Sequence, residues 1–237
     1  MSHTPAFTPP RNLYAGPRLK PTRGLSLAVT ALLALCAATD VFSVVVHINT
    51  YDLLGNVTAD GVAAYTVEEG RRADHLVNLG AVSYGLALIV TAVVFIIWFH
   101  RTRKNAEVFA PGIQGRRAGW AVGGWFVPLG SLWIPHGIAS DSWDASSPTA
   151  ADGSRRPAPR ALLTAWWTAW VLSLALGRIS SVLGRSSDDP VMYRQSVAVM
   201  LAGDVVDLAA AVLAVFFVRK LTHMQLTKAA EGPYATV

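Results

Sequence analysis

Four apolar runs constrain this chain more than any other feature of its sequence. Each is about as long as the ~20 residues that an α-helix needs to cross a bilayer. The runs are Gly24–Ile48, Leu76–Phe99, Ala161–Leu183 and Ser196–Val218. Because backbone polar groups find no water inside lipid, segments of this kind cross it as helices. The sequence therefore predicts an all-α fold, a polytopic membrane helix bundle with four full transmembrane helices.

Composition supports a membrane protein over a soluble domain. The chain has 237 residues, of which 52% are hydrophobic and only 15% are charged, and this balance is too apolar for an ordinary soluble protein. Its formal charge of +5 comes from Lys and Arg that flank the apolar runs, where they set orientation in a membrane. We therefore expect no nucleic-acid partner. The single cysteine, Cys36, excludes an internal disulfide.

The same patterns divide the chain into three parts. Residues 1–22 are rich in Pro and basic residues, which is typical of a disordered tail. Residues 23–223 hold the four spans and form the predicted transmembrane domain. Residues 224–237 form a C-terminal tail. The first apolar run is longer than the ~7–15 residues of a signal-peptide core, so we interpret it as a retained helix.

The segment 119–139 is apolar but unlike a simple span. It carries several Gly, two Pro (Pro128 and Pro135) and three Trp. Irregular backbone survives at membrane depth only where protein or trapped water satisfies it. The segment therefore predicts a broken element, either re-entrant or interfacial, or alternatively a fifth span. Tryptophans here and near the predicted span ends are typical of aromatic belts at the membrane boundary.

Basic residues favour the model with four spans. If 119–139 does not cross, fifteen Lys and Arg lie on the side of the termini and five on the other; if it crosses, the split is twelve to eight. Positive charge is retained on the cytoplasmic side. We therefore expect a multi-pass protein of the bacterial plasma membrane with both termini in the cytoplasm, and the fifth span stays open as an alternative.

Ionisable side chains inside the spans need a reason, because each costs ~2.5–3.5 kcal/mol at the centre of a membrane helix. Counting ~1.5 Å per residue from the outer ends of the spans places several at similar depth. They form a predicted polar layer of Asp40, Tyr84, Arg178 and Asp204. In one interpretation Arg178 neutralises an aspartate and holds helices together. In the other the layer is a proton or substrate site.

Two aspartate pairs have the spacing that puts both carboxylates on one helical face, and their members are the candidate catalytic residues: Asp141, Asp144, Asp204 and Asp207. Paired carboxylates can hold a divalent cation, since hard cations prefer oxygen ligands. His136 with Asp141 and Asp144 is a weak candidate for a metal site. The alternative for the first pair is that Asp141 caps a helix starting at Ser142, with Asp144 in its first turn.

A series of motifs lies between the second and third runs: Trp98-x-x-Arg101, Asn105-Ala106, Gly119–Pro128, Leu132–Pro135 and Asp141–Ser146. In order and spacing this stretch resembles the bacterial membrane family known as domain of unknown function 4328, frequent in actinobacteria. The resemblance extends from Leu76 to Val218 and implies a polytopic membrane protein, with no established activity. It implies these candidates for a shared site or a shared fold: Arg101, Asn105, Trp125, Trp133, Pro135, Asp141 and Trp143.

Two functions of different classes are compatible with these features. The first is a non-enzymatic integral membrane protein, such as a scaffold, an accessory subunit or a transporter-like component. Its partners would be membrane lipids and either another membrane protein or a second copy of the chain. The second is an intramembrane enzyme that acts on a lipid or isoprenoid through the paired aspartates, with a divalent cation as its cofactor. The sequence does not decide between them.

Overall fold

The computed structural model describes residues 18–60, 66–148, 158–185 and 189–231. Four long helices dominate it: α1 (Arg23–Asp60), α2 (Val67–Phe109), α5 (Ala161–Arg185) and α6 (Pro190–Glu231). All four are long and apolar enough to cross a membrane, and the described residues contain no β-strand. The prediction of an all-α bundle with four membrane-length helices is confirmed.

The helices continue beyond the apolar runs that predicted them. The 43 residues of α2 extend ~65 Å, about twice the ~30 Å thickness of a bilayer core. Helix α2 begins at a capping box in which Thr66 and Glu69 satisfy each other's backbone N–H groups. Helix α6 likewise runs on to Glu231, past the predicted boundary at residue 223, because Met224 and Gln225 still pack inside the bundle.

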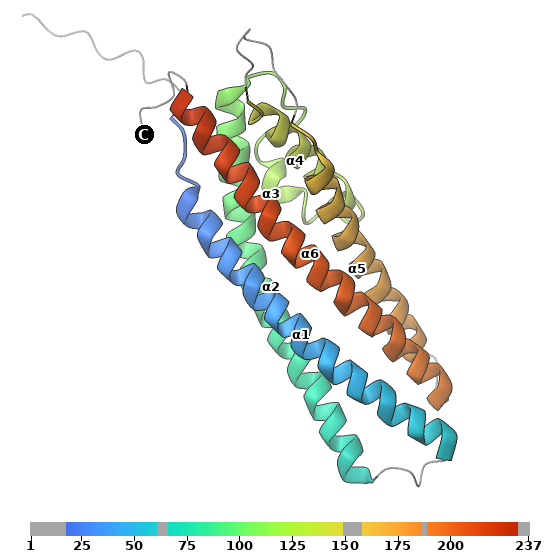
Figure 1. The fold of residues 1–237 in the computed structure, drawn as a ribbon. Helices are drawn as coiled ribbons and strands as arrows, with labels where there is room; N and C mark the ends of the chain where they lie inside the picture. The colour runs from blue at the N-terminus through green and yellow to red at the C-terminus, as the bar shows by residue number, and fades with distance from the viewer. Residues whose placement is uncertain (1–17, 61–65, 149–157, 186–188, 232–237) are drawn as a thin grey trace, which may run out of the picture.

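The long helices pack in the order α2–α1–α6–α5 (Figure 1). Helix α1 contacts α2 and α6 along its length, and α6 contacts α5, whereas α2 and α5 are not a packed pair. They meet through side chains instead, as where the rings of Phe95 and Trp166 lie 5.8 Å apart. The bundle therefore has one loosely closed seam, between α2 and α5.

The segment between α2 and α5 folds as short pieces. They are α3 (Trp120–Gly123), the 3-10 helix η2 (Gly130–Leu132) and α4 (Ile134–Ala145). Leu129, between two of them, has a positive φ of 59°, and Pro135 stands in the first turn of α4, where proline is tolerated. None of the pieces is long enough to span a bilayer. The fifth span is thus absent from the part of the chain that the structure describes.

These short pieces lie at the same end of the bundle as the start of α1 and the end of α6 (Figure 1). We call this the aromatic end, because the tryptophans gather here. Trp98 and Trp143 are almost fully buried, and Trp166 and Trp167 are buried with them against Phe217. The sequence predicted that the tryptophans form a belt at the membrane boundary. Only Trp120 and Trp133 are exposed in the way that such a belt requires. Most of the tryptophans instead form the packed core.

Candidate functional site

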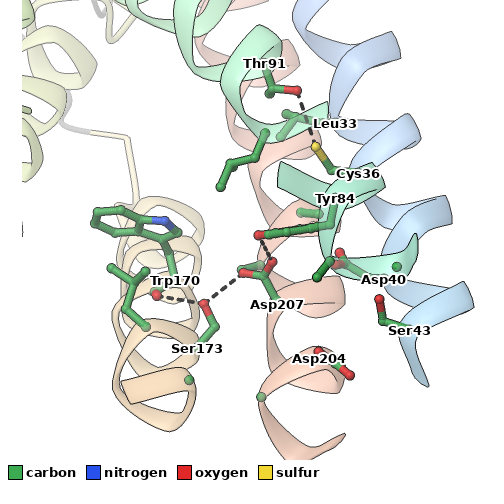
Figure 2. A pocket seen from close by; sticks show the side chains of 18 of the residues that line it. Leu33, Cys36, Asp40, Ser43, Tyr84, Thr91, Trp170, Ser173, Asp204 and Asp207 are labelled. Atoms are coloured by element: carbon green, nitrogen blue, oxygen red, sulfur yellow. Dashed lines mark hydrogen bonds between the residues drawn. The ribbon is translucent and has the colours of Figure 1, made fainter. Parts of the chain in front are cut away.

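A cavity of about 750 Å³ lies between the four long helices, and all four contribute to its wall (Figure 2). Its volume falls within the ~300–1,000 Å³ of ligand pockets in proteins. The wall is mostly apolar but contains three aspartates, Asp40 from α1 and Asp204 and Asp207 from α6. Aspartates on a cavity wall inside membrane-length helices mark this region as the leading candidate site.

Asp207 connects three helices. Its carboxylate accepts a hydrogen bond of 2.5 Å from the hydroxyl of Tyr84 on α2 and one of 2.8 Å from the hydroxyl of Ser173 on α5. Figure 2 shows both side chains pointing to the carboxylate across the cavity. Because α2 and α5 do not pack against each other, this carboxylate is one of the few polar links across their seam.

Asp204 has a different partner, the imidazole of His47 on α1. The distance from His47 Nδ1 to Asp204 Oδ2 is 2.5 Å, and the two side chains are only 9% and 19% exposed. The pair joins α1 to α6. This hydrogen bond engages Nδ1 of His47.

Asp40 is the third aspartate and the least satisfied. The residue is 3% exposed, and its Oδ2 has no hydrogen-bond partner among the described residues. None of the residues on the cavity wall is Lys or Arg. A buried carboxylate normally has a partner, because leaving it unpaired costs free energy.

The structure brings together three members of the predicted polar layer, Asp40, Tyr84 and Asp204. It does not bring Arg178 to them: this residue is exposed on α5 and does not line the cavity. The reason is helical phase. At ~100° per residue, Arg178 points ~100° away from Gly177 and ~140° away from Ser173, both of which line the cavity. The expected neutralisation of Asp40 or Asp204 by Arg178 is therefore wrong.

Sequence reasoning missed two pairings. Asp207 has partners in Tyr84 and Ser173, although it has no evident partner in the sequence. The pairing of His47 with Asp204 was also unexpected. The sequence places His47 on the same face of α1 as Asp40, at i+7, but does not indicate its partner on α6. Cys36, in an apolar run, is buried on the cavity wall with its sulfur 3.3 Å from the Thr91 hydroxyl.

The other acid pair lies in α4, away from the cavity. Asp141 Oδ2 accepts a hydrogen bond of 3.1 Å from the backbone N–H of Gly115, and Asp144 forms an ion pair with Arg160. That hydrogen-bonded pairing raises the pKa of Arg160. Helix α4 starts at Ile134, so the expectation that Asp141 caps a helix from Ser142 is wrong, and both acids fold the segment onto its neighbours.

His136 is also part of the packing of α4. Its ring centroid lies 5.5 Å from that of Trp167. Burial lowers the pKa of His136, with a smaller contribution from the positive charge of Arg160. Among the described residues, no group of three or more His, Cys, Asp or Glu side chains is arranged to hold a metal ion. The predicted metal candidates His136, Asp141 and Asp144 thus do not form such a group.

The two aspartate pairs do not share one site. Trp143 of α4 stacks on Phe217 at a ring distance of 6.0 Å, and Phe217 follows Asp207 by ten residues on α6. At ~1.5 Å per residue this corresponds to ~15 Å along the helix. No residue of α4 lines the cavity. A single active site that uses both pairs is therefore not formed.

The remaining motif residues hold the aromatic end together. Asn105 pairs through its side-chain amide with both the backbone N–H and C=O of Lys20, at 2.7 and 2.9 Å, and Arg101 donates to the carbonyl of Pro21. Trp125 is half-buried and packs against the aromatic core, with Trp170 5.8 Å away. Pro135 and Trp143 are buried, whereas Trp133 is exposed. These residues fix the chain entering α1 and the segment between α2 and α5.

Four membrane-length helices around an acidic cavity define a multi-pass, all-helical membrane protein. The chain belongs to the family described as Domain of unknown function (DUF4328), whose model matches residues 63–223. No curated protein and no solved structure matches the chain. The matched residues exclude α1, so Asp40 and His47 come from outside the family domain, whereas Tyr84, Asp204 and Asp207 lie within it.

Proposed function

We propose that this protein is a transporter-like component of the membrane that binds an amphipathic small molecule in the cavity between its long helices. The observation that carries the proposal is the cavity itself: about 750 Å³, mostly apolar, and lined by three aspartates. A protein that served only as a scaffold would gain stability by filling this space, since a cavity costs free energy in a packed interior.

The seam between α2 and α5 supports entry of the molecule from the lipid. These two helices both line the cavity but are not packed against each other. The link through Asp207 to Tyr84 and Ser173 crosses the seam by hydrogen bonds alone. Across the same seam the rings of Phe95 and Trp166 also meet, 5.8 Å apart. Opening the seam beside Asp207 costs less free energy than separating an apolar helix interface of the same length.

The intramembrane enzyme with paired aspartates has less support. Asp141 and Asp144 are engaged by Gly115 and Arg160, and Asp204 and Asp207 lie apart from them in the cavity. A divalent cation would need several oxygen ligands around one point. The acid pair of α4 is better explained by its contacts with neighbouring segments of the fold. The acid pair of α6 is better explained as the polar part of the cavity wall.

The proposal also includes the setting of the protein. We propose the bacterial plasma membrane, with the aromatic end on the cytoplasmic side, because most Lys and Arg belong to that end. In a Cys36→Ala background, an impermeant maleimide should label a cysteine placed at Asn56 or Asp189 on intact cells but not one at Pro148; all three positions are exposed. Labelling of the cysteine at Pro148 alone would show that the protein has the opposite orientation.

Two glycines offer a matched test of binding. A Cβ added at Gly177 meets no atom within 4 Å, and Gly177 lines the cavity; a Cβ at Gly85 also meets no atom, but Gly85 does not line it. We expect Gly177→Leu to occupy the cavity and Gly85→Leu to leave it open. Leucine has a higher helix propensity than glycine at both positions. A difference in probe binding between the two variants therefore reports on the cavity.

The experiment measures equilibrium binding of two probes to the protein in lipid nanodiscs, with empty nanodiscs as background. The probes are methyltriphenylphosphonium, which is cationic, and triphenylmethanol, which is neutral and of similar size. We expect the wild type to bind at least one of them, Gly177→Leu to lose that binding, and Gly85→Leu to retain it. Binding of neither probe, or equal binding by all three proteins, would contradict the proposed function.

A further inference from the structure

We infer that the cavity selects lipophilic organic cations, with the carboxylate of Asp40 as the counter-charge. The inference rests on the proposed function and names the class of molecule that the cavity binds. It follows from three features of the wall: an unsatisfied buried acid, an excess of acidic over basic groups, and a set of aromatic rings.

Asp40 is the group that lacks a partner. It is 3% exposed, and its Oδ2 accepts no hydrogen bond within the described part of the chain. Asp40 is nonetheless one of the residues that line the cavity (Figure 2), although its Oδ2 is itself covered by neighbouring atoms. A buried carboxylate that faces an apolar cavity is satisfied by a positive charge placed in that cavity.

The charges around Asp40 do not supply that positive charge. Asp204 and Asp207 of α6 are acids, Tyr84 of α2 donates its hydroxyl to Asp207, and no Lys or Arg is on the wall. The one basic group, His47, is 2.5 Å from Asp204. When ionised, three acids against one histidine give the cavity a negative potential, which favours a cation over a neutral or anionic molecule.

The aromatic side chains favour an organic cation over a metal ion. The wall facing the aromatic end includes Phe95, Trp125, Trp166 and Trp170. Ring faces attract organic cations, and aromatic walls are a recurrent means of binding quaternary ammonium groups. A metal ion would require clustered ligands, and no group of three or more ligating side chains exists among the described residues. The mostly apolar wall suits the hydrocarbon part of a lipophilic cation.

The test compares the same two probes, methyltriphenylphosphonium and triphenylmethanol, across variants of one acid. Asp40→Asn keeps the size of the side chain but removes its charge, and Asp40→Glu keeps the charge. Asp52→Asn is the control, because Asp52 is an exposed acid of the same helix that does not line the cavity. Each protein is assayed in lipid nanodiscs, and the neutral probe reports whether the cavity is intact.

We expect wild type, Asp52→Asn and Asp40→Glu to prefer the cationic probe. Asp40→Asn should bind it about thirtyfold more weakly, the loss typical of removing one partner from a buried charge pair, while its binding of the neutral probe is unchanged. If Asp40→Asn loses both probes, a preference retained by Asp40→Glu supports the inference and its loss overturns it.

The outcomes separate this inference from the function on which it rests. If wild type binds both probes equally, or if Asp40→Asn keeps the full preference for the cation, the inference is wrong and the binding function stands. If wild type binds neither probe, the proposed function fails. If Asp52→Asn loses the preference for the cationic probe and Asp40→Asn keeps it, the probe is attracted to the protein surface. That result would overturn the inference as well.

Discussion

The aromatic end and the cavity are parts of one bundle with opposite packing. At the aromatic end the indole N–H groups of three buried tryptophans have partners: Trp98 donates to Thr222, Trp143 to the carbonyl of Ala158, and Trp167 to the carbonyl of Leu132. The indole N–H of Trp125 is the exception and has none among the described residues. Asp40, which lines the cavity of about 750 Å³, has a buried carboxylate oxygen without a partner among the described residues. In the function that we propose, stability and binding are divided between the two regions.

Polar groups at the aromatic end serve the same purpose as its rings. Gln225 donates to the carbonyl of Thr102 and to the hydroxyl of Ser146, and Asn105 donates to Gln225. A buried polar network that is satisfied in this way rigidifies the structure around it. The aromatic end thus forms a rigid frame. The distance between α2 and α5 can vary farther along the bundle, at the seam.

The largest effect should follow from breaking the aromatic end. Trp143 is 2% exposed and stacks on Phe217, so Trp143→Ala should lower the free energy of unfolding by ~3–5 kcal/mol. Trp133, which is 58% exposed, provides the matched control, and Trp133→Ala should change it little. Unfolding by sodium dodecyl sulfate in mixed micelles measures both. Similar losses of stability in the two variants would contradict the stabilising role of the aromatic end.

The pairing of His47 with Asp204 should give a smaller effect, on the cavity side. A double-mutant cycle with His47→Phe and Asp204→Asn should yield a coupling free energy of ~0.5–3 kcal/mol, as for side chains in direct contact. The same unfolding assay supplies the four values. Additive effects would mean that the 2.5 Å contact adds no stability, and α1 would then be held to α6 by apolar packing alone.

Asp40 should behave in the opposite sense from the residues of the aromatic end. Because its carboxylate is buried without a full set of partners, Asp40→Asn should raise the stability of the empty protein by ~0.5–2 kcal/mol, as expected where a binding group is retained at a cost to stability. Unfolding without any probe present tests this. Destabilisation by Asp40→Asn would assign Asp40 a structural role and weaken the comparison.

The smallest effect concerns pH at the aromatic end. Burial lowers the pKa of His136 below its ordinary value of 6.5, so the unfolded chain takes up a proton at a higher pH than the folded chain. Stability should therefore fall as pH decreases from 6.5 toward the folded pKa. The variant His136→Gln should lose this part of the pH dependence. An unchanged profile would mean that another group causes it.

Much of the fold was predictable, because hydropathy over ~20 residues determines which segments cross a membrane. The four runs became α1, α2, α5 and α6. The phase of each helix was less predictable. Arg178 and Ser173 lie in the same run, yet only Ser173 faces the cavity, and this depends on how α5 packs against α6. Depth counted along a span does not specify direction around it.

The candidate site was partly predictable for the same reason. Asp40, Tyr84 and Asp204 drew attention as costly groups in apolar runs, and they meet at one cavity. Their pairing was not predictable, since it depends on contacts over long sequence separations such as that of His47 with Asp204. The role of the tryptophans was predicted wrongly. A ring near a membrane boundary can either contact lipid or pack into a core, and Trp98 and Trp143 pack into the core.

The most direct test of the central claim is an experimental structure of the protein in a lipid nanodisc with methyltriphenylphosphonium added. We expect density for the cation between the Asp40 carboxylate and the ring of Trp170, with α2 and α5 still unpacked at their seam. A structure in which these helices close on each other and side chains fill the space beside Asp40 would contradict it.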